Sequence, residues 1–280
     1  MRARRLLLLV LGLGLIVTAW GYGEAVSEPR ARTAKLDLAG WPAGAPRLRI
    51  LLLSDLHVAG PDMPPERLSF ILDRVAAERP DIVLIAGDLV SDKRLSTHRY
   101  GLFESVAPLK RLNPRFGTFA VLGNHDHWRD AREARRALAA AGVRVLDNEA
   151  VRAGPLSLGG LDDAFTGHDR LEATIESMRA IEGARILLSH SPDPFPELPG
   201  DVALMVAGHT HCGQIRLPLI GAISSMSRYG ERYACGLVRE KGKILVVSAG
   251  LGTSIMPVRI GAPPDYWLLD VGGVRPAEAR

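Results

Sequence analysis

Five short groups of polar residues in this chain consist of residue types that bind metal ions, and each group follows an apolar run. The groups are Asp55-Leu56-His57, Gly87-Asp88, Gly123-Asn124-His125-Asp126, Leu188-Ser189-His190 and Gly208-His209-Thr210-His211. Any one of them has an ordinary explanation, because a lone histidine at a strand end is more often a satisfied polar residue than a ligand. Five such groups in one chain are not explained in that way. Imidazole and carboxylate together suit divalent manganese, iron or zinc, so the sequence predicts a metal site.

The apolar runs before these groups predict an α/β or mixed layered domain. Runs rich in leucine, isoleucine and valine predict buried strands over 48–54, 81–87, 117–123, 184–190 and 201–209. Amphipathic stretches predict helices from Pro64, over 97–110, over 129–141 and around 171–181, and the chain after residue 209 is β-rich. In open sheets ligands bind outside the carboxyl ends of the strands, so the five groups are expected to meet at one edge.

Composition and charge indicate one globular body with a basic N-terminal arm. The chain has 280 residues, of which 47% are hydrophobic and 24% charged, and these values exclude a polytopic membrane protein and a disordered chain. The formal net charge is +4, and residues 1–36, with six basic and two acidic side chains, account for all of it. The rest of the chain is formally neutral. No nucleic-acid partner is expected, because nucleic-acid grooves tend to be basic.

Residues 1–23 predict a transmembrane anchor or an export signal, because three arginines precede the uncharged stretch Leu6–Trp20. The lack of a clear cleavage site and the interfacial aromatics Trp20 and Tyr22 favour an uncleaved anchor in the inner membrane, with export after cleavage as the alternative. The flanking arginines favour an outward-facing body. A linker is expected over 24–46, the catalytic domain over 47–272 and a tail over 273–280.

The two cysteines and three of the histidines stand outside the five groups. Cys212 and Cys235 are interpreted as two buried free thiols in preference to a single bridge. His127 is a candidate for the wall of the site or for a structural position. His98 and His168 are expected in plain loops or at helix starts. The charged stretch 127–136 is expected to be a solvated helix rather than a phosphate-binding patch.

The five groups resemble, in order, the sequence blocks of the calcineurin-like metallophosphoesterases, which are D-x-H, G-D, G-N-H-[DE], H and G-H-x-H. The resemblance covers about residues 48–215. It implies a four-layer αββα sandwich of two mixed β-sheets flanked by helices, here preceded by one N-terminal hydrophobic helix. It also implies a hydrolase that acts on phosphoric ester or anhydride bonds.

The same resemblance implies a role for each matched residue. Two divalent metal ions would be the cofactors, and a hydroxide bridging them would attack the phosphorus. His125 would protonate or stabilise the leaving oxygen as the catalytic residue, with Asp126 behind it. The implied metal ligands are Asp55, His57 and His211 for one ion, Asn124, His190 and His209 for the other, and Asp88 as the bridge.

Two later stretches resemble a membrane-anchored or exported phosphodiesterase branch of this family. They are GHTHCGQIRLP (208–218) and GLGTSIMPVRIGAPP (250–264). The likeness implies a UDP-2,3-diacylglucosamine hydrolase-like activity in lipid A biosynthesis, with a lipid-linked phosphate ester as substrate. Ser248-Ala249 stands where an arginine is expected, and Arg259 is the candidate replacement. This branch has a cytoplasmic substrate, which conflicts with an outward-facing body.

Two other functions remain open at the level of the sequence. The same site would suit a nuclease or nucleotide phosphodiesterase with a soluble substrate. A non-catalytic, metal-bound scaffold at the membrane belongs to a different class, and the presence of His125 beside every implied ligand argues against it.

Overall fold

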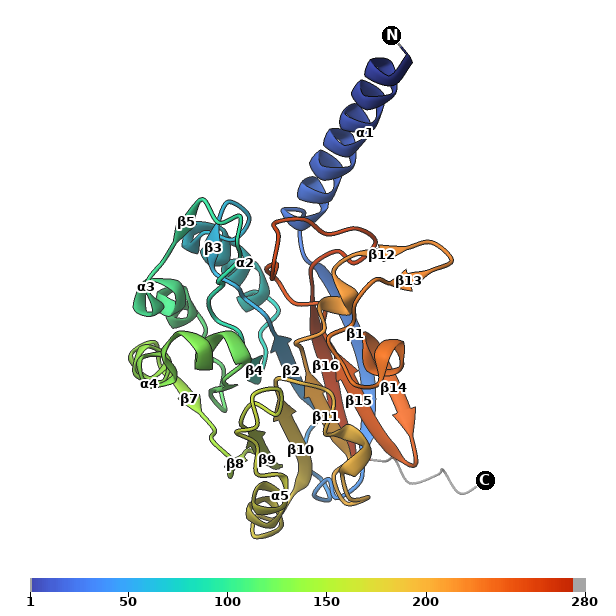
Figure 1. Cartoon of the computed structure of the whole chain (residues 1–280). Helices are drawn as coiled ribbons and strands as arrows, with labels where there is room; N and C mark the ends of the chain where they lie inside the picture. Colours follow the sequence, from blue (N-terminus) through green and yellow to red (C-terminus); the bar gives the residue numbers. More distant parts are fainter. Residues whose placement is uncertain (1, 274–280) are drawn as a thin grey trace.

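The computed structural model describes residues 2–273, which form two mixed β-sheets packed face to face with helices on both outer sides (Figure 1). The four-layer sandwich expected from the sequence is confirmed. Buried residues of both sheets, such as Leu52 and Leu188, form the central core. A second core lies between one sheet and the helices over it, and a third lies behind the other sheet.

The first sheet has six strands, of which only the β16–β2 pair is antiparallel. Ile50 and Leu52 of β2 face the core between the sheets, and Leu51 and Leu53 face the helices, so the strand is apolar on both faces. In sheet order the strands are β1 (Arg30–Leu38), β16 (Asp265–Gly273), β2 (Leu48–Leu53), β4 (Ile82–Ala86), β6 (Thr118–Val121) and β7 (Val143–Val145).

The second sheet also has six strands, with an antiparallel strand at each edge and parallel pairs between them. In sheet order they are β14 (Gly236–Glu240), β15 (Lys243–Val247), β11 (Leu204–Ala207), β10 (Ala184–Ser189), β9 (Leu156–Leu161) and β8 (Glu149–Ala153). Two short ribbons lie outside the sheets. They are β3 (Ala59–Gly60) with β5 (His98–Arg99), and β12 (Arg216–Leu217) with β13 (Gly221–Ala222).

Helices cover the outer face of each sheet. Over the first sheet lie α2, which begins at Pro65 as expected, then α3 and α4, and α5 lies over the second. The bounds are α2 (Pro65–Ala76), α3 (Leu102–Val106), α4 (Asn124–Ala140) and α5 (Leu171–Arg179). Four 3₁₀ turns complete the body, namely η1 (Ala107–Arg111), η2 (Phe195–Glu197), η3 (His211–Gly213) and η4 (Gly230–Tyr233).

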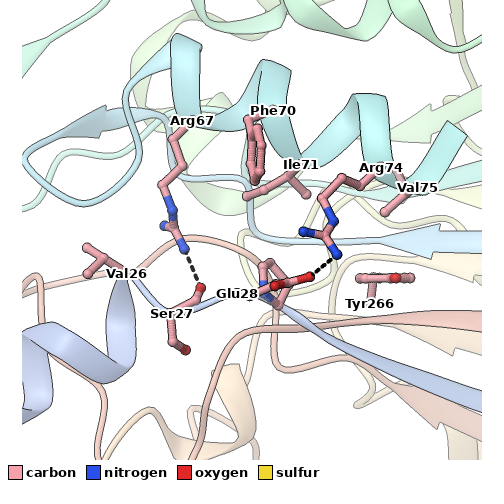
Figure 2. A pocket seen from close by; sticks show the side chains of 10 residues that line it. Val26, Ser27, Glu28, Arg67, Phe70, Ile71, Arg74, Val75 and Tyr266 are labelled. Atoms are coloured by element: carbon pink, nitrogen blue, oxygen red, sulfur yellow. Dashed lines mark hydrogen bonds and ion pairs between the residues drawn. The ribbon is translucent and has the colours of Figure 1, made fainter. Parts of the chain in front are cut away.

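Helix α1 (Arg2–Ala25) projects from one end of the body (Figure 1). Within the described residues it is the one helix whose length and composition would allow it to cross a membrane. The connection from α1 to β1 is held against α2, where a cavity of about 190 Å³ lies beneath it (Figure 2). Arg67 donates to the carbonyl of Ser27 at 2.8 Å, and Arg74 pairs with Glu28 at 2.5 Å.

Three local expectations differ from the structure. The stretch 24–46, expected as a linker, contains strand β1, which pairs in parallel with β16 at the edge of the first sheet. Only Leu36 and Leu38 of β1 are buried, so its apolar signal is weak. Helix α4 begins at Asn124, five residues before its expected start, and the stretch 97–110, expected as one helix, is divided into β5, α3 and η1. Of the expected tail, Gly273 ends β16, and residues 274–280 lie outside the described residues.

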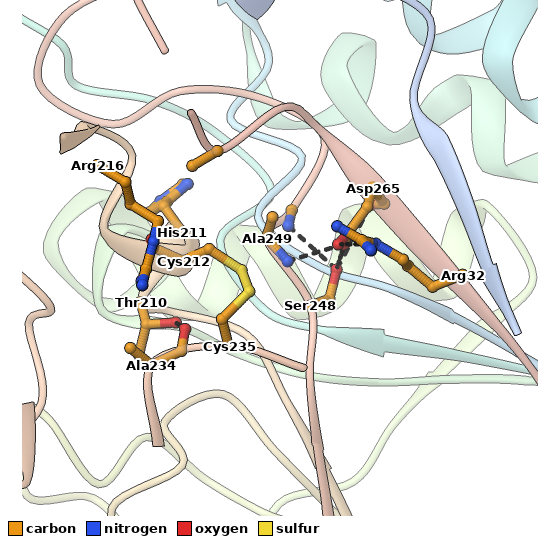
Figure 3. The surroundings of a disulfide bond; sticks show 12 residues. Arg32, Thr210, His211, Cys212, Arg216, Ala234, Cys235, Ser248, Ala249 and Asp265 are labelled. Atoms are coloured by element: carbon orange, nitrogen blue, oxygen red, sulfur yellow. Dashed lines mark hydrogen bonds and ion pairs between the residues drawn. A yellow bond between two sulfur atoms is a disulfide. The ribbon is translucent and has the colours of Figure 1, made fainter. Parts of the chain in front are cut away.

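The expectation of two free thiols is wrong, because Cys212 and Cys235 form a disulfide bond (Figure 3). Their Cα atoms lie 4.7 Å apart, a separation typical of bridged cysteines. Cys212 follows the metal-ligand candidate His211, and the bridge closes the excursion of the chain that carries β12, β13 and η4. The sequence could not reveal this contact, because it depends on how that excursion returns to the sheet.

Replacing both cysteines by serine is expected to lower the free energy of unfolding by about 3 kcal/mol, because the bridge closes a loop with a sequence separation of 23. The melting temperature of the full chain in detergent should then fall by roughly 5 to 10 °C. Adding a reductant to the wild type should reproduce that fall and should leave the serine variant unchanged. Equal melting temperatures for the two proteins without reductant would show that the bridge contributes nothing.

Candidate metal centre

All seven ligand candidates follow the carboxyl end of a strand, and the structure brings them together at one edge of the two sheets. Asp55 and His57 follow β2, Asp88 follows β4, Asn124 follows β6, His190 follows β10, and His209 and His211 follow β11. Each of these side chains is buried. The topology therefore gathers, in one place, residues that lie more than 150 positions apart in the sequence.

The backbone is strained at five of these positions. Each of the five has a positive φ angle, between 43° and 70°, a region that side chains other than glycine rarely enter. Such conformations cost free energy and persist where the surrounding structure holds them, commonly at functional sites. The five residues are Asp55, His57, Asp88, His209 and His211.

One group of donor atoms converges between Asp55, His57, Asp88 and His211. The Nε2 atoms of His57 and His211 lie 3.0 Å apart. The Asp55 Oδ1 atom lies 3.5 Å from Nε2 of His211, and the Asp88 Oδ2 atom lies 3.4 Å from Nε2 of His57. These separations leave an enclosed point that several donor atoms face at once.

A second group converges on the other side of Asp88. His190 Nε2 lies 3.1 Å from Asn124 Oδ1 and 3.1 Å from His209 Nδ1. The same Asp88 Oδ2 atom lies 3.3 Å from His190 Nε2. Asp88 therefore faces both groups of donors, which is the position the family resemblance implies for a bridging carboxylate.

Three histidine rings are oriented by backbone carbonyls, each of which faces the ring nitrogen that points away from the donor groups. His57 Nδ1 faces the carbonyl of Val90 at 3.2 Å, and His190 Nδ1 faces the carbonyl of Ala86 at 2.7 Å. His209 Nε2 faces the carbonyl of Met226 at 3.1 Å. A carbonyl only accepts, so these outer nitrogens carry the protons.

The inward ring nitrogens of His57, His190 and His209 lie about 3 Å from other candidate ligand atoms, namely His211 Nε2, Asn124 Oδ1 and His190 Nε2. The donor set fits divalent metals of the manganese, iron and zinc type. The described residues include three groups that could hold a metal ion, and Asp88 belongs to two of them.

Burial favours the neutral form of three of the candidate ligand histidines. It lowers the pKa of His57 and His211 well below the usual value, and it lowers the pKa of His209 to about 3. Burial alone would raise the pKa of Asp88, but His190 and His57 hold it well below its usual range. Three neutral imidazoles beside an ionised Asp88 are ready to bind a metal ion. Burial alone would lower the pKa of His190, but Asp88 raises this pKa well above its usual value, so that a metal ion would displace the proton of His190.

Two glycines allow the strand ends to approach one another closely. A Cβ atom on Gly208 would collide with the carboxylate of Asp55, and one on Gly123 would lie 2.7 Å from the backbone nitrogen of Asp88. Any larger residue at either place would push a ligand candidate away. Glycine at these two positions permits the close backbone approach.

His125 lies half-buried at the edge of the donor groups, on the first turn of α4. Its backbone nitrogen donates to Oδ1 of Asp88 at 2.9 Å. Its ring lies with Nδ1 3.8 Å from Asp92 and with Nε2 3.5 Å from the hydroxyl of Ser254. A histidine here can exchange a proton with a molecule bound in front of the donor groups.

Asp126 does not stand behind His125 as the sequence analysis expected. Its buried carboxylate accepts hydrogen bonds from the backbone nitrogens of Asp88, Leu89 and Gly123, each at 2.9 Å. The carboxylate thereby ties the turn after β4 to the start of α4. Asp126 is thus a positioning residue for Asp88, and the carboxylate near the His125 ring belongs to Asp92.

Removing the Asp126 carboxylate is expected to destabilise the fold. Asp126→Ala would leave three buried backbone N–H groups unpaired, at about 1 to 3 kcal/mol for each. We expect a loss of at least about 3 kcal/mol in the free energy of unfolding, measured by urea denaturation after metal chelation. Asp126→Asn, which keeps one accepting oxygen, should lose less. A loss below about 1 kcal/mol for the alanine variant would contradict this structural role.

Arg259 lies behind the donor groups, and it is not among the residues that line the cavity in front of them. Its guanidinium donates to the carbonyls of Ala249 at 2.8 Å, Gly252 at 2.5 Å and Ala262 at 2.9 Å, and it lies 3.3 Å from His211 Nδ1. Burial lowers its pKa to about 10, so it stays charged at neutral pH. It therefore holds the loop behind His211 instead of replacing a substrate-binding arginine.

Ser248, where an arginine was expected, is buried away from the donor groups. Its hydroxyl donates to Asp265 at 2.8 Å, and Arg32 lies 3.5 Å from the same carboxylate (Figure 3). The serine at this place links the end of β15 to the start of β16.

The three remaining histidines lie outside the donor groups. His127 bonds Asp162 at 2.8 Å, and its ring stacks on that of His168 with centroids 3.9 Å apart. His98 is exposed in β5 beside Tyr100. His127 is thus held in a structural contact, and the charged side chains after it lie largely on the exposed face of α4, as expected.

A cavity of about 490 Å³ opens in front of the donor groups. Its inner wall includes Asp88, Asn124, His125, His209 and His211, and its mouth is largely apolar, although the exposed Arg94 also lines the cavity. The apolar residues of the mouth are Trp128, Ile223, Met226, Ile255 and Met256, and no sequence motif pointed to them. Ile255 and Met256 do lie in the stretch 250–264 that resembles the phosphodiesterase branch. This stretch contacts the other such stretch, 208–218, where Gln214 accepts a hydrogen bond from the backbone of Ser254 at 2.9 Å.

Comparisons with known proteins agree with the geometry of the site. A family model described as calcineurin-like phosphoesterase matches residues 48–213. The chain is 28% identical over 269 residues to the uncharacterized metallophosphoesterase YkuE of Bacillus subtilis, with 91% of each chain covered. It is 31% identical over 235 residues to an uncharacterized metallophosphoesterase of Aquifex aeolicus, with 81% of this chain and 85% of that one covered.

A third relative is a vertebrate protein of greater length. The chain is 29% identical over 273 residues to a transmembrane protein with metallophosphoesterase domain from Danio rerio. The match covers 89% of this chain and 60% of that protein.

Proposed function

Because this chain belongs to the calcineurin-like phosphoesterase family and is a phosphoester hydrolase, we propose that it is a two-metal phosphodiesterase acting on a phosphate group of a membrane lipid. The observation that carries the proposal is the pair of buried donor groups that share Asp88, whose Oδ2 atom lies 3.4 Å from His57 Nε2 in one group and 3.3 Å from His190 Nε2 in the other. The division of ligands implied by the family resemblance matches these two groups.

The residues around the cavity have separate roles in the proposed hydrolysis. When bound, two divalent ions would polarise the phosphoryl oxygens and make water a better nucleophile near neutral pH. Asp88 and the histidines of the two donor groups would hold the ions, and Asp126 holds the turn of Asp88. His125, at the cavity edge, is the residue that would donate a proton to the leaving oxygen of the ester. No covalent bond to the protein is needed.

The apolar mouth and helix α1 support a membrane substrate. We propose that α1 anchors the chain in the inner membrane and that residues 47–272, together with β1, form the catalytic domain. The Cys212–Cys235 bridge supports an outward-facing body, because disulfides persist in oxidising compartments. On that side the substrate would be a phospholipid or a related phosphodiester. A cytoplasmic body would instead favour a UDP-2,3-diacylglucosamine-like substrate, and a C-terminal reporter fusion distinguishes the two sides.

Hydrolysis of bis(p-nitrophenyl) phosphate tests the reaction class. The purified full chain should lose turnover after chelation and recover it when manganese is added, with zinc and iron as parallel trials. An exposed-site variant such as Asp147→Asn should behave as the wild type. A protein that binds two metal ions yet hydrolyses neither diesters nor monoesters would refute the proposed function.

A further inference from the structure

Large apolar side chains stand exposed on two loops beside the base of α1. Four of them are more than half exposed, with Leu219 fully accessible and Ile220 at 71%. The first loop is the β12–β13 hairpin with the residues after it, and the second covers residues 254–258. We call this set the apolar rim, and it consists of Leu219, Ile220, Ile223, Ile255 and Met256.

The apolar rim is joined to α1 by backbone hydrogen bonds. Arg259 donates its backbone N–H to the carbonyl of Gly21 in α1 at 2.9 Å, and the backbone N–H of Gly261 donates to Glu24 at 3.2 Å. Gly21 packs closely here, since a Cβ atom on it would lie 3.2 Å from the Arg259 oxygen. Arg216, where the hairpin begins, in turn donates to the carbonyl of Ile260 at 2.7 Å. Helix, loop and hairpin thus form one connected unit.

The position along α1 indicates how deep this unit would lie. Trp20 and Tyr22 end the apolar stretch of α1, and such aromatics mark the boundary between lipid and water. Gly21, the residue between them, is the one bonded to the loop of Arg259. Figure 1 shows the β12–β13 hairpin at the same end of the body as the base of α1. A bilayer that contains α1 would therefore have its surface at the level of the apolar rim.

The apolar rim also forms part of the cavity mouth. Ile223, Ile255 and Met256 line the same cavity as His125 and the donor groups. The cavity consequently leads from the apolar rim to the donor groups. A lipid whose tails stay among the apolar side chains could place its phosphate at the inner wall.

We propose that the apolar rim enters the headgroup layer of the leaflet in which α1 ends, so that a lipid phosphate reaches the donor groups without leaving the bilayer. The occupant of this surface is that leaflet. Apolar side chains at a membrane surface bury their area about 5 to 10 Å deep, at the boundary of headgroups and acyl chains. The docking surface stands on the geometry above, whereas its catalytic consequence rests on the proposed function.

Fluorescence quenching tests the position of the apolar rim. Ile220→Cys in the full chain is labelled with an environment-sensitive fluorophore and reconstituted in vesicles of phosphatidylethanolamine and phosphatidylglycerol. We expect blue-shifted emission that nitroxide-labelled lipids quench. The matched control is Glu182→Cys, since Glu182 is exposed in the turn before β10, near α5 at the opposite end of the body (Figure 1). Its label should stay unquenched.

Two outcomes would overturn the docking surface. A label at residue 220 with the emission it has in water would place the apolar rim outside the bilayer. Blue-shifted emission without quenching by lipid would show that a second copy of the chain covers the apolar rim instead.

Turnover separates this inference from the proposed function. The variant with Leu219→Glu and Ile220→Glu should hydrolyse phosphatidylglycerol in vesicles about tenfold more slowly than the wild type, while turnover of bis(p-nitrophenyl) phosphate stays the same. An equal change on both substrates, or none on either, would refute the role of the apolar rim. A wild type without turnover on either substrate would refute the proposed function and leave the quenching result to decide the docking surface.

Discussion

Asp88→Asn is expected to remove bound metal and to lower kcat on bis(p-nitrophenyl) phosphate by at least about a thousandfold. One Asp88 oxygen lies 3.3 to 3.4 Å from the inward nitrogens of both His57 and His190, so a single carboxylate serves both donor groups. A neutral amide cannot balance two cations there. Elemental analysis of the purified variant and steady-state kinetics measure the two effects.

His209→Ala should show the same loss of metal and activity, because His209 belongs to the second donor group and its Nδ1 lies 3.1 Å from His190. The matched carboxylate control is Asp147→Asn. Asp147 pairs with Arg135, and neither residue belongs to the donor groups or to the cavity lining. That control should keep full metal content and activity. Normal metal content together with normal turnover in Asp88→Asn would show that Asp88 does not bridge the ions.

His125→Ala is expected to keep its metal and to lose rate. The ring of His125 stands at the cavity edge with Nε2 3.5 Å from Ser254, and its backbone contacts the Asp88 carboxylate independently of the ring. Removing a general acid lowers kcat by about a hundredfold to ten-thousandfold. The loss should be greatest for esters with alkyl leaving groups, because a p-nitrophenolate leaves without needing a proton.

The contrast between leaving groups distinguishes proton donation from a loss of structure. His127→Ala is the matched control, since His127 lies two residues further along α4 and bonds Asp162 instead. It should keep its rate on both kinds of ester. If His125→Ala released metal, His125 would be a ligand rather than a proton donor.

Much of the site could be predicted because its residues follow strands that are apolar on both faces. Such strands are recognisable from the sequence alone, and parallel strands deliver their carboxyl ends to one edge. The positions of Asp55, Asp88 and His190 could be derived in this way. The tautomers of the histidines could not, because they depend on the carbonyls of Val90, Ala86 and Met226, which no local pattern reveals.

Contacts made across the fold account for the errors of the sequence analysis. Strand β1 has only two buried side chains and is stabilised by pairing with β16, more than 200 residues away. The family resemblance implies that Asp126 stands behind His125, yet successive residues of a helix point in different directions. The Cys212–Cys235 bridge and the buried Arg259 likewise depend on loops whose paths the sequence does not determine.

Anomalous X-ray diffraction from crystals of the full chain grown with manganese tests the central claim most directly. Two anomalous peaks are expected, one on each side of Asp88. The first should lie among Asp55, His57 and His211, and the second among Asn124, His190 and His209. Both peaks should disappear in crystals of Asp88→Asn. A single peak, or peaks that Asp88 does not touch, would contradict a two-metal phosphodiesterase centre in this protein.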